Sequence, residues 1–173
     1  MCSRSATTVG RIGLSDVEAF RELRLRALRD DPKAFGSTHE NETQRSLAEW
    51  RARVEDSTAG DSAFLALATV DGVAVGMVGG YEPADRPADR EVVSMWVGPA
   101  WRGKGLGRSL IEAVEAWAAA AGAVHLTLWV VASNTPAVNL YHRAGFAETG
   151  ETRPLPSDQS LIQMQMSKSI TPG

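Results

Sequence analysis

A stretch rich in glycine and basic side chains occupies residues 98–107, which read GPAWRGKGLG. Glycines leave backbone N–H groups unobstructed, and a run of such groups before a helix forms a concave site for an anion. An apolar run, EVVSMWV, precedes the stretch and a helical pattern follows it. The stretch therefore connects a strand to a helix and is suited to holding a phosphate group. The alternative is a glycine-rich turn with solvated cations.

Two nucleotide motifs come close to this pattern without matching it. Gly98, Gly103 and Lys104 fit a nucleotide-binding P-loop, but Gly105 stands where Ser or Thr should hold magnesium. A dinucleotide fingerprint needs the spacing G-x-G-x-x-G, whereas Gly103 begins G-x-G-x-G. The pattern therefore disfavours nucleotide hydrolysis and dinucleotide binding.

The elements around this stretch alternate between helix and strand. Helical spacing of apolar residues predicts a first helix from its cap at Ser15 to Pro32, and a short second helix over residues 47–54. A polar loop is expected between these two helices. Asp71 and Gly72 separate two apolar runs, which is a strong hairpin signal. The further expected elements are strands at 91–97 and 124–131, helices at 103–122 and 136–145, and two closing strands within 146–168.

Composition limits the class of protein. The chain has 173 residues, is 43% hydrophobic and carries a formal net charge of −3. This predicts one domain over residues 1–173 with a disordered start at 1–7, and it argues against a nucleic-acid partner. Cys2 is the only cysteine and the three histidines lie far apart, so neither a disulfide framework nor a metal site is expected. No run approaches the roughly 18 apolar residues of a membrane span, and a cytoplasmic protein is expected.

The block from Val93 to Phe146 resembles the GNAT superfamily of N-acetyltransferases. Arg102-x-x-Gly105-x-Gly107 has the form of the pyrophosphate loop of that family. Asn134, Leu140-Tyr141 and Gly145-Phe146 have the form of its second signature. The matching block covers about a third of the chain. The resemblance implies a mixed α/β (α+β) fold with a mostly antiparallel sheet of six to seven strands, a splayed parallel pair and about four helices.

The resemblance also implies acetyl-CoA as the donor substrate, bound where the two parallel strands separate. Strand backbone would pair with the pantetheine arm, the glycine-rich loop would hold the pyrophosphate, and no metal would be needed. The residues that the resemblance places at this site are Met95, Trp96, Val97, Arg102, Gly103, Lys104, Gly105, Leu106, Gly107, Arg108, Asn134 and Tyr141.

The resemblance assigns two catalytic candidates. Tyr141 has the position of the acid that protonates the leaving thiolate. Glu91 corresponds in register to the base of the histone-modifying branch, and the alternative is an exposed carboxylate at the end of a strand. The branch that acetylates ribosomal proteins has a glutamate five residues before the signature asparagine, and this chain has Trp129 there. Backbone N–H groups near Met95 could polarise the thioester carbonyl.

The acceptor is less defined than the donor. The leading hypothesis is an enzyme that acetylates a primary amine of a small molecule or peptide by direct attack; the alternative is a non-catalytic acyl-CoA-binding regulatory module. A homodimer is possible by analogy with the family. Several acidic and aromatic residues near the first two helices and before Glu91 are candidates for acceptor binding, namely Phe35, His39, Glu40, Glu42, Trp50, Tyr81, Asp85 and Asp89.

Overall fold

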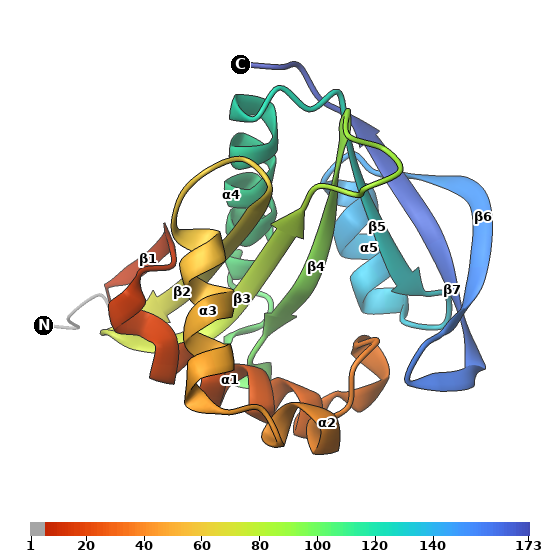
Figure 1. Ribbon diagram of the computed structural model, residues 1–173. Coiled ribbons are helices and arrows are strands. Elements are labelled where there is room, and N and C mark those ends of the chain that lie inside the picture. The colour runs from red at the N-terminus through yellow and green to blue at the C-terminus, as the bar shows by residue number, and fades with distance from the viewer. Residues whose placement is uncertain (1–5) are drawn as a thin grey trace, which may run out of the picture.

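The computed structural model describes residues 6–173 and arranges seven strands in a single sheet (Figure 1). The strands follow the order β1-β2-β3-β4-β5-β7-β6. They are β1 (Thr7–Arg11), β2 (Ala63–Val70), β3 (Val73–Tyr81), β4 (Asp89–Val97), β5 (His125–Val131), β6 (Ala147–Leu155) and β7 (Asp158–Ser169). The α-helices are α1 (Val17–Asp30), α2 (His39–Thr43), α3 (Leu47–Thr58), α4 (Leu106–Ala120) and α5 (Thr135–Arg143).

The sheet is antiparallel except between β4 and β5, which confirms the predicted parallel pair. That pairing runs from Asp89 opposite His125 to Val92 opposite Leu128 and then stops. Both strands continue for several residues, and they diverge toward their carboxyl ends (Figure 1). The edges of β4 and β5 beyond these pairs therefore face each other without a shared ladder.

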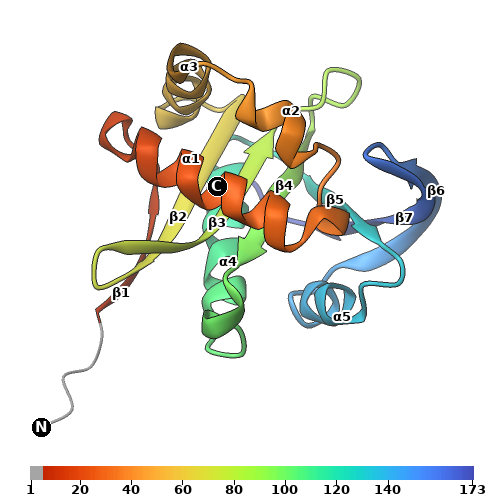
Figure 2. The ribbon, with the colours of Figure 1, turned by 90° about the horizontal axis from the view of Figure 1, so that it is seen from below.

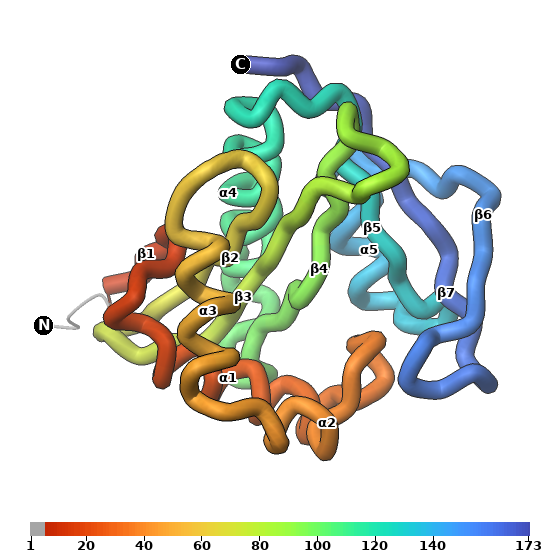
Figure 3. The backbone as a smooth tube through the Cα atoms, in the orientation of Figure 1, coloured from red at the N-terminus to blue at the C-terminus, as the bar shows by residue number. Residues whose placement is uncertain are grey.

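Helices cover both faces of the sheet. Figure 2, a view from below, places α1, α2 and α3 on one face and α4 and α5 on the other. Phe20 of α1 and Trp50 of α3 are fully buried in the first layer. In the second layer, Leu110 and Val114 of α4 are fully buried against the sheet. The β4–β5 gap therefore belongs to a sheet that has helices on both faces (Figure 3).

Local sequence explains the turns that join these elements. Asp71 and Gly72 both have positive φ, at 49° and 81°, as a tight hairpin turn between β2 and β3 requires. At α1 the cap is Asp16 rather than the predicted Ser15, which lies in a preceding turn of 3-10 helix. The side chain of Asp16 accepts a hydrogen bond from the backbone N–H of Gly13, and this contact fixes the turn.

Two segments differ from the sequence prediction. The expected loop between the first two helices contains α2, whose N-cap Thr38 accepts a hydrogen bond from the Asn41 N–H. The α-helices therefore number five in the part of the chain that the structure describes, not about four. Thr7 falls within the start predicted to be disordered, but it begins β1 and pairs with Val70 of β2. Residues 1–5, including Cys2, lie outside the described residues. No helix among the described residues is long and apolar enough to span a membrane.

Candidate functional site

A cavity of about 480 Å³ lies beside the carboxyl end of β5. One wall comes from the end of α1 and the turn that follows it, from Asp30 to Ala34. The opposite wall comes from Val131 and Asn134, where β5 ends and α5 begins, together with Leu161 of β7. The cavity therefore lies at the carboxyl end of β5, one of the two strands between which the resemblance places the cofactor.

The glycine-rich loop supplies an anion site before α4. Gly103 and Gly105 have φ of 73° and 86°, a conformation that side chains rarely adopt. Gly105 is the N-cap of α4, and no side chain caps the first N–H groups of that helix. These groups lack intrahelical acceptors and carry the positive end of the helix dipole. The loop therefore offers backbone donors of the kind that a pyrophosphate needs, and binding of a pyrophosphate there stays a prediction.

Gly107 serves a different purpose in the same loop. A Cβ at this position would lie 3.1 Å from Cδ2 of Leu140 and 3.5 Å from Cε of Met95. The missing side chain lets α5 approach the first turn of α4 closely. The spacing of the family motif thus combines two physical requirements, backbone conformation at Gly105 and close packing at Gly107.

The side chain of Arg102 anchors the loop within the fold, and its contact with a phosphate stays a prediction. Its Nη2 lies 2.7 Å from Oδ2 of Asp31, and its Nε donates to the carbonyl of Val97 at 2.8 Å. Its backbone N–H donates to the carbonyl of Pro99. Arg102 is therefore committed to the end of α1 and to β4. The same Asp31 oxygen accepts from the indole of Trp96 at 2.7 Å.

The other two cations of the loop also have neighbours. The Nζ atom of Lys104 lies 4.6 Å from the ring centre of Trp101. Arg108 pairs with Glu112 one helical turn away at 2.9 Å, and both side chains are mostly exposed. The candidate anion site thus consists chiefly of backbone N–H groups, and Lys104 is the loop cation that pairs with no acidic side chain within residues 6–173.

Tyr141 of α5 is buried and its hydroxyl is not engaged elsewhere. The residue is 7% exposed, and its ring packs edge-on against Phe146 at 5.8 Å between ring centres. The hydroxyl forms no hydrogen bond within residues 6–173. Burial raises the pKa of the phenol, so Tyr141 is protonated at neutral pH. At the start of the same helix, Oδ1 of Asn134 accepts from the Ala137 N–H at 3.3 Å, so Asn134 also caps α5.

Glu91 is not the exposed strand-end carboxylate of the alternative interpretation. It is 5% exposed and lies opposite Tyr81 in the β3–β4 ladder. The Tyr81 hydroxyl donates to Oε1 of Glu91 at 2.9 Å, and Nη2 of Arg86 lies 3.7 Å from Oε2. Burial and the charge of Glu91 raise the pKa of Tyr81 to about 12. Tyr81 is therefore a stable hydrogen-bond donor to a largely buried carboxylate.

The predicted acceptor residues fall into two groups. Phe35, Glu42 and Trp50 are buried in the described fold, because they pack beneath or between α1, α2 and α3. They do not line an acceptor site, in contrast to the prediction. His39 and Glu40 of α2 are at least partly accessible and remain candidates. Tyr81, Asp85 and Asp89 remain near Glu91, with Tyr81 39% exposed.

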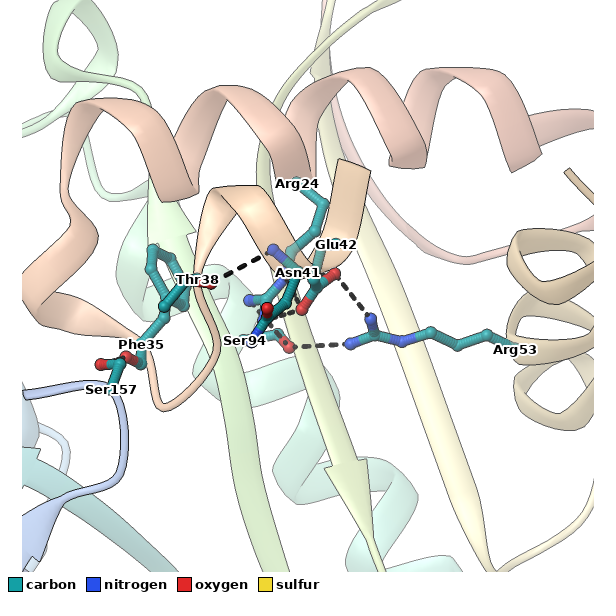
Figure 4. Close-up of polar contacts among 8 residues, drawn as sticks. All are labelled: Arg24, Phe35, Thr38, Asn41, Glu42, Arg53, Ser94 and Ser157. Atoms are coloured by element: carbon teal, nitrogen blue, oxygen red, sulfur yellow. Dashed lines mark hydrogen bonds and ion pairs between the residues drawn. The ribbon is translucent and has the colours of Figure 1, made fainter. Parts of the chain in front are cut away.

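An ionic cluster at α1, α2 and α3 was missed by sequence reasoning (Figure 4). Nη2 of Arg24 lies 2.8 Å from Oε1 of Glu42, and Nη1 of Arg53 lies 3.3 Å from Oε2. Both guanidinium groups also face Oγ of Ser94 in β4, at 3.4 and 3.5 Å. Burial raises the pKa of Glu42, but the hydrogen bond and charge of Arg24 outweigh it, so that the pKa lies below its ordinary value. No group of three or more potential metal-binding side chains occurs in the described part of the chain.

Comparison with known proteins decides the family. The model of the acetyltransferase (GNAT) family matches residues 19–146. The chain belongs to the GNAT acetyltransferase family. It is 46% identical over 54 residues to a streptothricin acetyltransferase from Streptomyces lavendulae, covering 31% of this chain and 29% of that protein. It is 32% identical over 137 residues to a mycothiol acetyltransferase from Nocardiopsis dassonvillei, covering 76% of this chain and 39% of that protein. The chain thus spans less than half the length of these curated relatives.

Solved structures of GNAT proteins share the fold. A GNAT acetyltransferase from Streptococcus pneumoniae superposes with a TM-score of 0.79 at 21% identity, covering 95% of this chain and 99% of that one. An N-acetyltransferase from Thermoplasma acidophilum, solved with coenzyme A bound, gives a TM-score of 0.73 at 16% identity, with coverage of 95% and 99%. These GNAT neighbours confirm the predicted fold class.

Proposed function

We propose that this GNAT protein transfers an acetyl group from acetyl-CoA to a primary amine within a ternary complex. The observation that carries the proposal is the gap between β4 and β5. The two strands stop pairing after Val92 and Leu128. The glycine-rich loop lies beyond one edge of this gap, and the second signature, with the unengaged hydroxyl of Tyr141, lies beyond the other. One arrangement thus combines an anion site, an extended channel and a proton donor.

The strands would hold the donor through backbone groups. Beyond Val92, β4 presents an edge with no partner strand on the β5 side, so an extended amide-containing arm can pair with it as an added strand does. The Val97 carbonyl already accepts from Arg102, which leaves Met95 as the better backbone partner on this edge. The N–H groups that follow Gly105 would bind the pyrophosphate.

Two side chains would transfer the protons that the reaction requires. The acceptor amine must be neutral to attack, whereas an alkyl ammonium has a pKa of roughly 10. Glu91 would remove that proton directly or through a water molecule, and its hydrogen bond from Tyr81 fixes its orientation. Acetyl-CoA supplies the activated thioester, and Tyr141 would donate its proton to the departing sulfur. Holding both substrates in line would provide much of the rate.

The acceptor would approach Glu91 from the loop before β4. Asp85 and Asp89 add carboxylates near the start of that strand, and their charge would attract a cationic amine. The panel that tests this should contain polyamines, aminoglycosides, streptothricin, amino acids and peptides. Release of free thiol from acetyl-CoA would identify the acceptor.

The proposed catalytic role is tested by Tyr141→Phe with any amine that supports turnover. Loss of the phenolic proton should lower kcat at neutral pH by about 10²-fold or more, while CoA binding measured by calorimetry changes little. Unchanged kcat would remove Tyr141 from the mechanism. Tight CoA binding without turnover for any amine would instead favour a non-catalytic acyl-CoA-binding module.

A further inference from the structure

Strand β4 contains a bulge at the point where it leaves β5. In the β3–β4 ladder, Val93 pairs with Gly79 and Trp96 pairs with Met77, so Ser94 and Met95 share the space opposite one residue. A bulge leaves its extra residue out of the ladder and turns the strand. This one begins two residues after Val92, the last β4 residue that pairs with β5.

Ser94 has a φ of 56°, in the left-handed region. Within residues 6–173 the other non-glycine residue with positive φ is Asp71, which lies in a hairpin turn where this conformation is expected. The left-handed conformation is energetically unfavourable for serine, so contacts with neighbouring groups must hold Ser94 in it. Its hydroxyl contacts the two guanidinium groups described above.

Those guanidinium groups are fixed by a carboxylate from a third helix. Arg24 and Glu42 have side chains that are 6% and 2% exposed, and Arg53 is 28% exposed. Arg24 also lies over the ring of Phe35 at 4.6 Å, which fixes its plane. The contacts to Ser94 Oγ are long, so each is weak alone. Their direction is set by the shared partner, Glu42 (Figure 4).

The cluster carries more positive than negative charge. Two guanidinium groups face one carboxylate, and burial together with the charge of Arg24 lowers the pKa of Arg53 below its ordinary value. A surplus positive charge beside a bulge lowers the energy of negative charge that develops nearby. Under the proposed function, that negative charge appears on the thioester oxygen as the amine attacks.

We propose that Glu42, Arg24 and Arg53 are positioning residues that hold the Ser94 bulge so that the Met95 N–H faces the acetyl carbonyl. This inference rests on the proposed function and adds residues that do not touch the reacting atoms. It connects α2, which carries Glu42, through Arg24 to the bulge beside the proposed carbonyl site. It also explains a strained serine at this point of β4.

Ser94→Gly and Ser94→Ala both remove the hydroxyl, so the pair isolates the effect of backbone conformation. Glycine adopts positive φ freely, whereas alanine keeps the steric penalty. The probe is acetyl-CoA labelled with ¹³C at the thioester carbonyl, whose stretching frequency is read by difference infrared spectroscopy in the bound state. Calorimetry with CoA, which has no acetyl carbonyl, controls for binding of the rest of the molecule.

In the unchanged protein the bound carbonyl band should lie below its frequency in water. Ser94→Ala should return the band at least halfway to the solution value, and Ser94→Gly should retain most of the shift. Glu42→Gln should behave like Ser94→Ala, and the exposed Glu55→Gln on α3 serves as its matched control. CoA affinity should stay within about twofold in all four variants.

An unshifted band in the unchanged protein would overturn the proposal, as would equal loss of the shift in the alanine and glycine variants. A Ser94→Ala band identical to that of the unchanged protein would also overturn it. In each of these cases acetyl-CoA still binds and the proposed function stands. Failure of the unchanged protein to bind acetyl-CoA would overturn both.

Discussion

Replacing Glu42 by glutamine removes a buried negative charge and keeps the shape of the side chain. In the folded protein this carboxylate is shared by Arg24 and Arg53, and its side chain is 2% exposed. After Glu42→Gln, both guanidinium groups would face a neutral amide in a site nearly closed to water. Uncompensated charge in such a place destabilises the folded state strongly.

The magnitude follows from the burial of the pair. Removing one partner of a buried ion pair costs about 3–5 kcal/mol. Glutamine still offers one oxygen as an acceptor, and Arg53 reaches some solvent, so the lower end of about 3 kcal/mol is expected. For a domain of this size, each kcal/mol lowers the melting temperature by about 2–4 °C. The expected decrease in melting temperature is therefore about 6–12 °C.

A second glutamate provides the matched control. Glu112 pairs with Arg108 at 2.9 Å, nearly the 2.8 Å distance between Glu42 and Arg24. The two side chains of that exposed pair are 60% and 70% accessible, however. Such pairs contribute less than about 1 kcal/mol. Urea unfolding of Glu42→Gln and Glu112→Gln at neutral pH compares the same substitution in two ion pairs of nearly equal N–O distance and very different burial.

The pH dependence gives the same prediction an independent test. Because the Glu42 pKa is lower in the folded than in the unfolded protein, its charge stabilises the fold fully above the ordinary value of 4.5. That contribution is lost as pH falls through the folded value. The stability difference between Glu42→Gln and the unchanged protein should therefore shrink in acid. Equal losses for both glutamates, or a difference that grows below pH 4.5, would refute the reasoning.

Three further substitutions test the loop and the packing around it. Gly105→Ala should weaken CoA binding about fivefold or more by calorimetry, because alanine at a φ of 86° costs about 1–2 kcal/mol. Gly80→Ala should destabilise the fold by about 1–3 kcal/mol in urea unfolding, because its Cβ would lie 2.6 Å from the ring of Trp117. Asp31→Asn removes the partner of Arg102, so stability at pH 7 should fall by less than about 1 kcal/mol. The pKa of Asp31 is lowered, since hydrogen bonds from Trp96 and Arg102 outweigh burial, so this loss should shrink as the pH of the unfolding experiment falls below 3.8.

Elements defined by local patterns were predictable from the sequence. The Asp71-Gly72 turn and the helix α4 each depend on residues within a few positions of one another, and both were found where expected. The helix α2 has five residues and no apolar face, so it had no periodic signal. Strand β1 is mostly exposed and equally short. Both elements form because the neighbouring layers supply partners that their own sequences do not indicate.

Candidate residues for the donor half of the site could be named from the sequence for the same reason, and the ionic cluster could not. Gly105, Gly107 and Tyr141 lie in motifs whose spacing predicts a role for each, and those roles stay predictions. Arg24, by contrast, acts on a serine 70 positions away, and a serine at position 94 carries no sign that its φ is positive. Charged residues on helices are ordinarily solvent-facing, so nothing in the sequence indicates a buried cluster, and Glu42 was predicted only as an acceptor-binding residue. Their burial arises only when three helices close over the β4 bulge, which makes the bulge, rather than any motif, the feature that gives these charges a function.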